Sequence, residues 1–232
     1  MTSGLVLWDV DGTLVRTAGA GTLAFLDAVE AVVGLRPDDG AGAFMAGKTD
    51  PQIALELLAG LGVASPDEHL AGVLVALERA LGDLVQHITD QGYVLPGVPE
   101  VVSTLAASGA WIQTLLTGNL VANAKVKLAA LGLGPGIDYD LGAYGSDHAD
   151  RCALVPIALG RLNERGIEVD RDRVWVIGDT PRDLECARAG AVRCLLVGTG
   201  SYSVSELSGL GADAVLADLS DPAHVIGLLS GR

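Results

Sequence analysis

The chain has 232 residues, of which 50% are hydrophobic and 4% aromatic, and it carries a net charge of −14. It can therefore build a sizeable aliphatic core, in one large domain or two smaller ones, and its acidity argues against nucleic-acid and anionic-membrane partners, which require a basic surface. Its three cysteines include no close-spaced pair, which argues against a disulfide framework or a zinc cluster and favours a reduced, cytoplasmic setting.

The ends and the composition of the chain also bear on its setting. We expect no signal peptide, because the first residues lack a charged segment followed by a long apolar one. No run approaches the roughly 18 apolar residues that a membrane span needs. Twelve arginines against three lysines are typical of a GC-rich bacterial genome.

The N-terminal part is predicted to be one strand followed by helices. Residues 4–12 (GLVLWDVDG) form a short apolar run that ends in acids and glycine, which predicts a buried strand. Residues 19–34 and 50–62 have helical patterns, and 66–92 are predicted to form one long helix. We therefore expect roughly residues 16–94 to be all-helical, without a strand.

From residue 95 onward, predicted helices and strands alternate. The expected helices cover residues 96–109, 119–132, 152–166, 181–190, 203–211 and 221–231. The expected strands cover residues 110–118, 139–145, 172–179, 191–198 and 212–218. This alternation predicts an α/β fold whose parallel sheet is covered on both faces. Ligands in such sheets bind at the carboxyl ends of the strands, so the residues there are the candidates for a functional site.

Two acids follow the first predicted strand. Asp9 and Asp11 are two residues apart, so they point to the same side of an extended segment. They are expected to repel each other unless they share a cation or a proton. A simple acidic turn is the alternative.

The next strand ends carry further polar groups. Thr117, Gly118 and Asn119 combine a hydroxyl, a glycine and the first amides of a helix, which suits an anion, although such residues also cap helices routinely. Asp179 directly follows four apolar strand residues and glycine. Asp183 is either a second acid of that site or the partner of a helix cap at Thr180.

Arg151 precedes the helix predicted at 152–166. A helix N-terminus favours anions, so the helix dipole gives no reason for a cation there. Taken alone, Arg151 is most simply a surface residue. Taken in order along the chain, however, the strand ends carry an acid pair, a hydroxyl, a cation and a second acid pair.

This ordered set resembles the motifs of the haloacid dehalogenase superfamily, in its C1-capped subgroup of phosphoglycolate phosphatase and β-phosphoglucomutase types. DVDGT is similar to the first motif, the threonine of LLTGN to the second, Arg151 to the third and GDTPRD to the fourth. The family more often has lysine at the third motif. The resemblance implies a three-layer Rossmann-like core of residues 1–15 and 95–232, with residues 16–94 inserted as an all-helical cap.

The resemblance also implies roles for these residues. Asp9 is expected to be the nucleophile that forms an aspartyl-phosphate, and Asp11 the general acid and base. Thr117 and Arg151 are expected to stabilise the phosphoryl group. The residues expected to hold Mg²⁺ are Asp9, Asp11 through its backbone carbonyl, Asp179, and Asp183 directly or through water. The residues expected to contact the substrate are Thr13, Gly118, Asn119 and Lys48.

The implied function is a Mg²⁺-dependent phosphatase acting on a small phosphorylated metabolite. Asp11 favours phosphate transfer over dehalogenation, because a halide leaving group needs no proton. A sugar-phosphate mutase of the β-phosphoglucomutase kind shares these motifs and stays an alternative. A non-catalytic metal-binding interaction protein is a further alternative, and the sequence does not indicate an oligomeric state.

Residues 42–49 (GAFMAGKT) match the P-loop pattern G-x-x-x-x-G-K-[ST] and so offer a nucleotide-binding alternative. A true P-loop follows a core strand and opens a core helix, whereas this segment lies within the predicted helical insertion. It is then either a plain loop between two helices or a cap loop that closes over the site. We favour the cap loop, in which Lys48 reaches the anionic part of the substrate.

Overall fold

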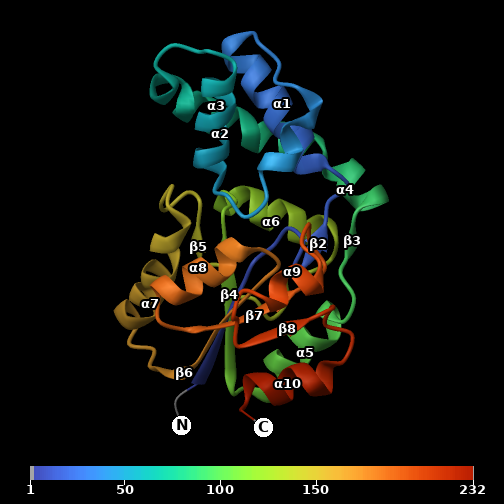
Figure 1. Ribbon diagram of the computed structural model, residues 1–232, viewed down its shortest axis with the longest axis vertical. Helices are drawn as coiled ribbons and strands as arrows, with labels where there is room; N and C mark the ends of the chain where they lie inside the picture. The colour runs from blue at the N-terminus through green and yellow to red at the C-terminus, as the bar shows by residue number, and fades with distance from the viewer. Residues whose placement is uncertain (1–2, 232) are drawn as a thin grey trace.

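The chain folds into an α/β core with a helical unit standing on one end of it (Figure 1). A computed structural model describes residues 3–231, apart from the side chains at 41 and 43. The main sheet has six parallel strands in the order β5-β4-β1-β6-β7-β8. These strands are β1 (Ser3–Trp8), β4 (Trp111–Thr117), β5 (Ala143–Tyr144), β6 (Val169–Gly178), β7 (Arg193–Val197) and β8 (Ala214–Leu216).

The central strand β1 explains why the sequence forms this sheet. It pairs with β4 on one side and β6 on the other, so that Leu5 lies opposite both Ile112 and Val174. Every residue from Gly4 to Trp8 is buried. A strand covered on both faces must be apolar throughout, and the run GLVLW meets that requirement.

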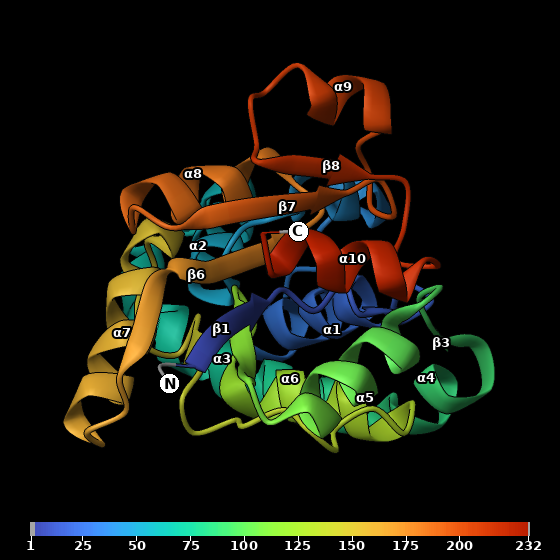
Figure 2. The same ribbon diagram turned by 90° about the horizontal axis from the view of Figure 1, so that it is seen from below.

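Helices cover both faces of the sheet, as Figure 2 shows from below. One face packs against α5 (Val98–Ser108), α6 (Val121–Ala130) and α10 (Pro222–Leu229). The other packs against α7 (Leu154–Glu164), α8 (Pro181–Ala189) and α9 (Val204–Ser208), with the short helix η2 (Arg151–Ala153) preceding α7. The predicted three-layer α/β architecture is confirmed.

The helical unit has an apolar cluster of its own. Its elements are α1 (Ala20–Val33), η1 (Asp39–Phe44), α2 (Asp50–Gly60), α3 (Pro66–Asp83) and α4 (Val85–Gln91). Phe25, Leu58, Leu77 and Ile88 are buried in this cluster, and Leu120 joins it from the core. Most of the segment between β1 and α5 is thus helical, as the sequence predicts.

The prediction of one long helix over residues 66–92 is wrong. The structure has two helices, α3 and α4, separated at Leu84, whose backbone leaves the helical region (φ −95°, ψ 6°). The break turns α4 towards the core, where the Thr89 hydroxyl lies 3.3 Å from the Ala130 carbonyl oxygen of α6. Packing on the core therefore overrides a continuous helical pattern.

The expectation of no strand within residues 16–94 is also wrong, at the two ends of that range. The strands β2 (Val15–Arg16) and β3 (Tyr93–Val94) form a two-stranded antiparallel ribbon where the chain leaves the core and returns to it. The two passages lie side by side, so their backbone groups pair with each other.

Candidate active site

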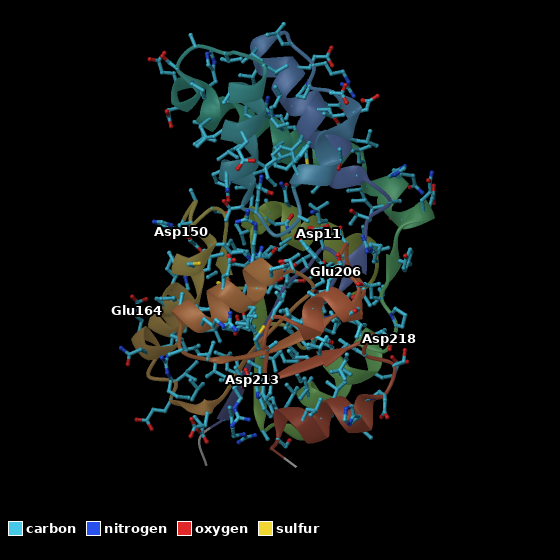
Figure 3. All side chains as sticks on the ribbon, viewed as in Figure 1. Asp11, Asp150, Glu164, Glu206, Asp213 and Asp218 are labelled. Atoms are coloured by element: carbon cyan, nitrogen blue, oxygen red, sulfur yellow. The ribbon has the colours of Figure 1, made fainter. Side chains whose placement is uncertain are left out.

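A pocket of about 460 Å³ lies between the carboxyl ends of the core strands and the helical unit. Residues from the ends of β1, β4 and β6 line it on the core side, and residues from α1 and from the loop before α2 line it on the other. Figure 3 shows Asp11 at this junction, whereas Glu164 and Asp213 lie on the body of the core. The pocket is where the rule for parallel sheets places a ligand.

Three buried carboxylates meet at the base of this region. Asp9, Asp179 and Asp183 each offer an oxygen, and these atoms all lie within 4.8 Å of one another. Asp9 and Asp179 directly follow the neighbouring strands β1 and β6, and Asp183 lies in the first turn of α8. The sheet topology therefore brings together acids that are 170 residues apart in the sequence.

The surroundings of these acids favour a bound cation. Burial raises the pKa of Asp9 to about 6, although the Arg151 guanidinium opposes the shift. Burial, and then the charges of Asp9 and Asp183, hold the pKa of Asp179 well above its usual range. A divalent cation with oxygen ligands would offset both penalties, so this set of donors fits Mg²⁺.

Arg151 is buried beside the acids and not exposed on the surface. Its Nη2 lies 2.8 Å from Asp9 Oδ1 and 2.5 Å from Asp183 Oδ1. Burial alone would lower the pKa of this guanidinium, but Asp183 and Asp9 together raise it. The short helix η2 thus delivers a permanent cation to Asp9.

Asp11 faces away from the three carboxylates. Its Oδ2 accepts hydrogen bonds from Asn119 Nδ2 at 2.8 Å and from Lys127 Nζ at 2.6 Å. Its side chain is 43% exposed and lines the pocket. This orientation leaves its backbone carbonyl, and not its carboxylate, as the group expected to reach a metal ion.

Thr13 and Thr117 are both buried and hydrogen-bonded within the site. The Thr13 hydroxyl donates to Asp179 Oδ1 at 3.1 Å, so Thr13 supports an acid of the cluster. Thr117 Oγ1 accepts a hydrogen bond from Asn119 Nδ2 at 2.8 Å. Asn119 therefore connects the end of β4 to Asp11.

Gly118 lies against the loop that precedes α2. Its carbonyl oxygen accepts a hydrogen bond from the Asp50 amide at 2.7 Å. A Cβ at Gly118 would lie 2.0 Å from the Lys48 carbonyl oxygen, so the close approach of the two main chains requires glycine. The structure brings Gly118 to the junction of the core and the helical unit.

Asp183 takes both of the roles considered for it. Its Oδ2 accepts hydrogen bonds from the amide and the hydroxyl of Thr180, at 3.0 and 2.7 Å, so the predicted helix cap is confirmed. Its Oδ1 bonds to Arg151. The residue therefore stabilises the start of α8 and also belongs to the acid cluster.

The segment 42–49 does not have the setting of a P-loop. It begins inside the short helix η1 and does not follow a strand, and Thr49 caps the start of α2 in the helical unit by accepting a hydrogen bond from the Gln52 amide at 3.3 Å. The structure therefore gives the nucleotide-binding alternative no support. Lys48 lines the pocket, and its ammonium group pairs with Glu56 of α2.

Comparisons with known proteins place this geometry in a family. Residues 6–188 match the family model of the haloacid dehalogenase-like hydrolases. The chain belongs to this family. The hydrolase is 31% identical to a phosphoglycolate phosphatase of Caulobacter vibrioides, over 97% of this chain and 92% of that one. It is 28% identical to a probable phosphatase of Dickeya dadantii, over 97% of this chain and 96% of the relative.

A solved structure supports the fold of the hydrolase. The β-phosphoglucomutase of Clostridium difficile superposes with a TM-score of 0.75 at 16% identity, covering 100% of this chain and 98% of that one. The family resemblance and the enzyme class expected from the sequence, a phosphatase, are confirmed.

Three polar residues of the hydrolase that the sequence reasoning missed lie beside the pocket. Asp50 Oδ2 accepts hydrogen bonds from the Leu120 amide at 2.8 Å and from Asn123 Nδ2 at 3.3 Å. Burial raises the pKa of the Asp50 carboxyl to about 6, although Lys127 opposes the shift. Asn123 and Lys127 follow Asn119 at intervals of four residues, and all three are buried. This spacing puts the three polar residues on one face of a helix, and it could have been recognised from the sequence.

Proposed function

We propose that the protein is a Mg²⁺-dependent phosphatase that hydrolyses a small phosphorylated metabolite through an aspartyl-phosphate on Asp9. The observation that supports this most directly is the convergence of Asp9, Asp179, Asp183 and Arg151 at the base of one pocket. A carboxylate held between a cation and a metal site can attack a phosphorus atom without strong repulsion from the phosphoryl oxygens.

In the first step, a carboxylate oxygen of Asp9 attacks the phosphorus atom and the bond to the substrate oxygen breaks. Arg151 stabilises the charge on Asp9 and on the phosphoryl oxygens, and Thr117 donates a hydrogen bond to the phosphoryl group. Asp11 gives a proton to the leaving oxygen. In the second step, Asp11 removes a proton from the water that cleaves the aspartyl-phosphate. The pocket-facing carboxylate of Asp11 supports this division of roles.

The residues proposed to hold Mg²⁺ are Asp9, Asp179 and the Asp11 backbone carbonyl, with Asp183 binding directly or through water. When bound, the ion supplies positive charge to the nucleophile and the phosphoryl oxygens. Thr13 fixes the Asp179 carboxylate for this role through its hydroxyl.

We further propose that residues 16–94 act as a cap on a core of residues 1–15 and 95–232. The loop at 47–50 lies against the core, where the Thr49 hydroxyl donates to the Ala149 carbonyl oxygen at 2.6 Å. Closure of such a cap excludes water from the pocket during phosphoryl transfer. Lys48, Gly118 and Asn119 are then placed to contact the substrate at the cap-facing side.

The first substrate to test is 2-phosphoglycolate, since relatives named for that activity match nearly the whole chain. We propose the bacterial cytoplasm as the setting, in keeping with three free cysteines. Among the described helices, none combines the length and the apolar character needed to cross a membrane.

The proposal is tested by measuring phosphate release from 2-phosphoglycolate and a panel of phosphorylated metabolites, with Mg²⁺ and with chelator. Asp9→Asn is expected to lower turnover by about a thousandfold or more, because the amide is a poor nucleophile. Asp172→Asn, an exposed position on β6, is the matched control and should leave turnover unchanged. Turnover that survives Asp9→Asn would remove Asp9 as the nucleophile, and conversion to an isomeric phosphate without release would indicate a mutase.

A further inference from the structure

Lys127 on α6 is a cation of the site that none of the proposed steps uses. Its side chain is only 6% exposed, whereas Lys125, two residues earlier on the same helix, is exposed. The Lys127 ammonium lies 2.6 Å from Asp11 Oδ2 and 2.6 Å from Asn119 Oδ1. Burying a lysine costs free energy unless partners satisfy its charge, so these contacts determine where it lies.

The three side chains form a closed network. Asn119 Nδ2 donates to the same Asp11 Oδ2 that Lys127 contacts, at 2.8 Å, while Asn119 Oδ1 accepts from Lys127. Lys127 thereby fixes both the carboxylate and the orientation of the amide beside it. A carboxylate with a direct ammonium partner and an oriented amide donor is held more firmly than one with either alone.

The position of the Asp11 carboxylate matters because a competing site lies nearby. Asp9, Asp179 and Asp183 form a cluster suited to a divalent cation, and Asp11 is only two residues from Asp9. A free carboxylate on this turn would be attracted towards a cation held by that cluster, and so away from the leaving-group side of the pocket. The ion pair with Lys127 pulls in the opposite direction.

We infer that Lys127 is a positioning residue that holds the Asp11 carboxylate on the leaving-group side of the pocket. The inference rests on the proposed function, in which Asp11 delivers a proton to the leaving oxygen. In this inference α6 contributes to the chemistry through Lys127, which positions Asp11. None of the residues that follow the strands has this role.

A positioning role predicts a dependence on the leaving group. An alkoxide such as that of glycerol phosphate needs the proton from Asp11, whereas p-nitrophenolate leaves without one. Lys127→Met should therefore lower kcat/KM for glycerol phosphate by about 10- to 100-fold and change kcat/KM for p-nitrophenyl phosphate by less than about threefold. The quantity kcat/KM is chosen because it reports the transfer to Asp9 and not the later hydrolysis.

The matched control is Lys125→Met, which removes the same charge from an exposed position of α6 and should change neither substrate. Lys127→Arg retains the charge and should restore part of the activity on glycerol phosphate. If Lys127→Met fails to fold, Lys127→Gln tests the same point, since it removes the charge but keeps a polar group. Glycerol phosphate has an uncharged leaving alcohol, so a loss there does not reflect binding of a substrate carboxylate.

The failures of the inference and of the proposed function are distinguishable. Asp11→Asn should show the same preference for p-nitrophenyl phosphate in stronger form. If it does, and Lys127→Met lowers both substrates equally or neither, the role of Lys127 is overturned while the proposed function stands. If Asp11→Asn shows no such preference, the acid role of Asp11 is wrong and the inference falls with it.

Discussion

Arg151 is the cation that contacts the buried acids of the site. It bonds to two buried carboxylates, Asp9 and Asp183, and is itself buried. The cation and the two acids offset the free-energy cost of burying one another's charges. Each of them would be costly to bury without the others. Replacement of the cation alone therefore leaves two acids without their charged partner.

We expect Arg151→Met to lower the free energy of unfolding by about 3–5 kcal/mol, because it leaves buried charges unpaired. Arg151→Lys keeps a charge but loses the planar fork, so its loss should be smaller. The comparison is Arg165→Met, whose ion pair with Asp140 is exposed and measures 3.9 Å, and which should change stability by less than about 1 kcal/mol. Urea denaturation without added Mg²⁺ measures all three, and equal losses for Arg151→Met and Arg165→Met would contradict this account.

The sequence predicted the candidate site residues that follow strands, together with Arg151, which lies in the short helix η2. Asp9, Asp11, Asp179 and Arg151 could be ordered along the chain, and the sheet topology brings them to one place. Asp50 was not found, because its partners on α6 are 70 or more residues away and come from a different unit. Local patterns do not encode which helix of an insertion will meet the core.

At the scale of elements, the turn between β4 and α6 packs directly on the loop that precedes α2. Asp50 donates its amide proton to Gly118, and the space beside Gly118 is filled by the Lys48 carbonyl. Gly145 continues this contact, since a Cβ there would lie 2.0 Å from the Gly118 carbonyl oxygen. Three segments of main chain therefore meet without intervening side chains.

Gly118→Ala is expected to destabilise the protein by about 1–3 kcal/mol, because its methyl group meets main-chain atoms that cannot rotate away. The matched control is Gly160→Ala on α7, where a Cβ meets nothing within 4 Å, and which should be stabilising by about 0.5–1 kcal/mol. Thermal unfolding compares the two variants. A Gly118→Ala protein as stable as the wild type would show that this loop moves away at little cost.

Most elements could be predicted from periodicity and turn residues, but the ribbon of β2 and β3 and the break between α3 and α4 could not. The ribbon of β2 and β3 has two residues in each strand, which is too short for an alternating pattern to be recognised. The break at Leu84 is equally invisible, because the apolar pattern continues across it. The ribbon arises from pairing between the two connecting segments, and the break from packing of α4 on the core, rather than from local sequence preference.

At the scale of the whole molecule, a buried acid helps to join the helical unit to the core. The Asp50 carboxylate lies over the first turn of α6, where it accepts the Leu120 amide proton. Burial raises its pKa to about 6, while the charge of Lys127 lowers it and that of Asp11 raises it. Folding therefore favours the protonated form of this carboxyl, relative to the unfolded chain.

This shift makes stability depend on pH in a defined direction. Between about pH 4 and pH 6 the unfolded Asp50 ionises before the folded one, so its contribution to stability is present below this window and is lost as pH rises through it. The loss is up to about 3 kcal/mol for a shift of about two units.

Asp50→Asn cannot ionise and should lose less stability than the wild type between pH 4 and pH 7. Asp67→Asn, at an exposed position of α3, is the control and should follow the wild type. Denaturant unfolding at several pH values gives the difference between variant and wild type. A difference that stays constant across the window would contradict the shift at Asp50.

The antiparallel ribbon of β2 and β3 has a consequence for the order of folding. The neighbouring strands β1 and β4 are separated by residues 9–110, a long loop whose closure costs entropy. When Arg16 pairs with Tyr93, the ends of the helical unit are already held together. Only the short segments 9–16 and 93–110 then separate β1 from β4. If the helical unit forms first, it brings the distant halves of the sheet together, and a long-range contact becomes nearly a local one.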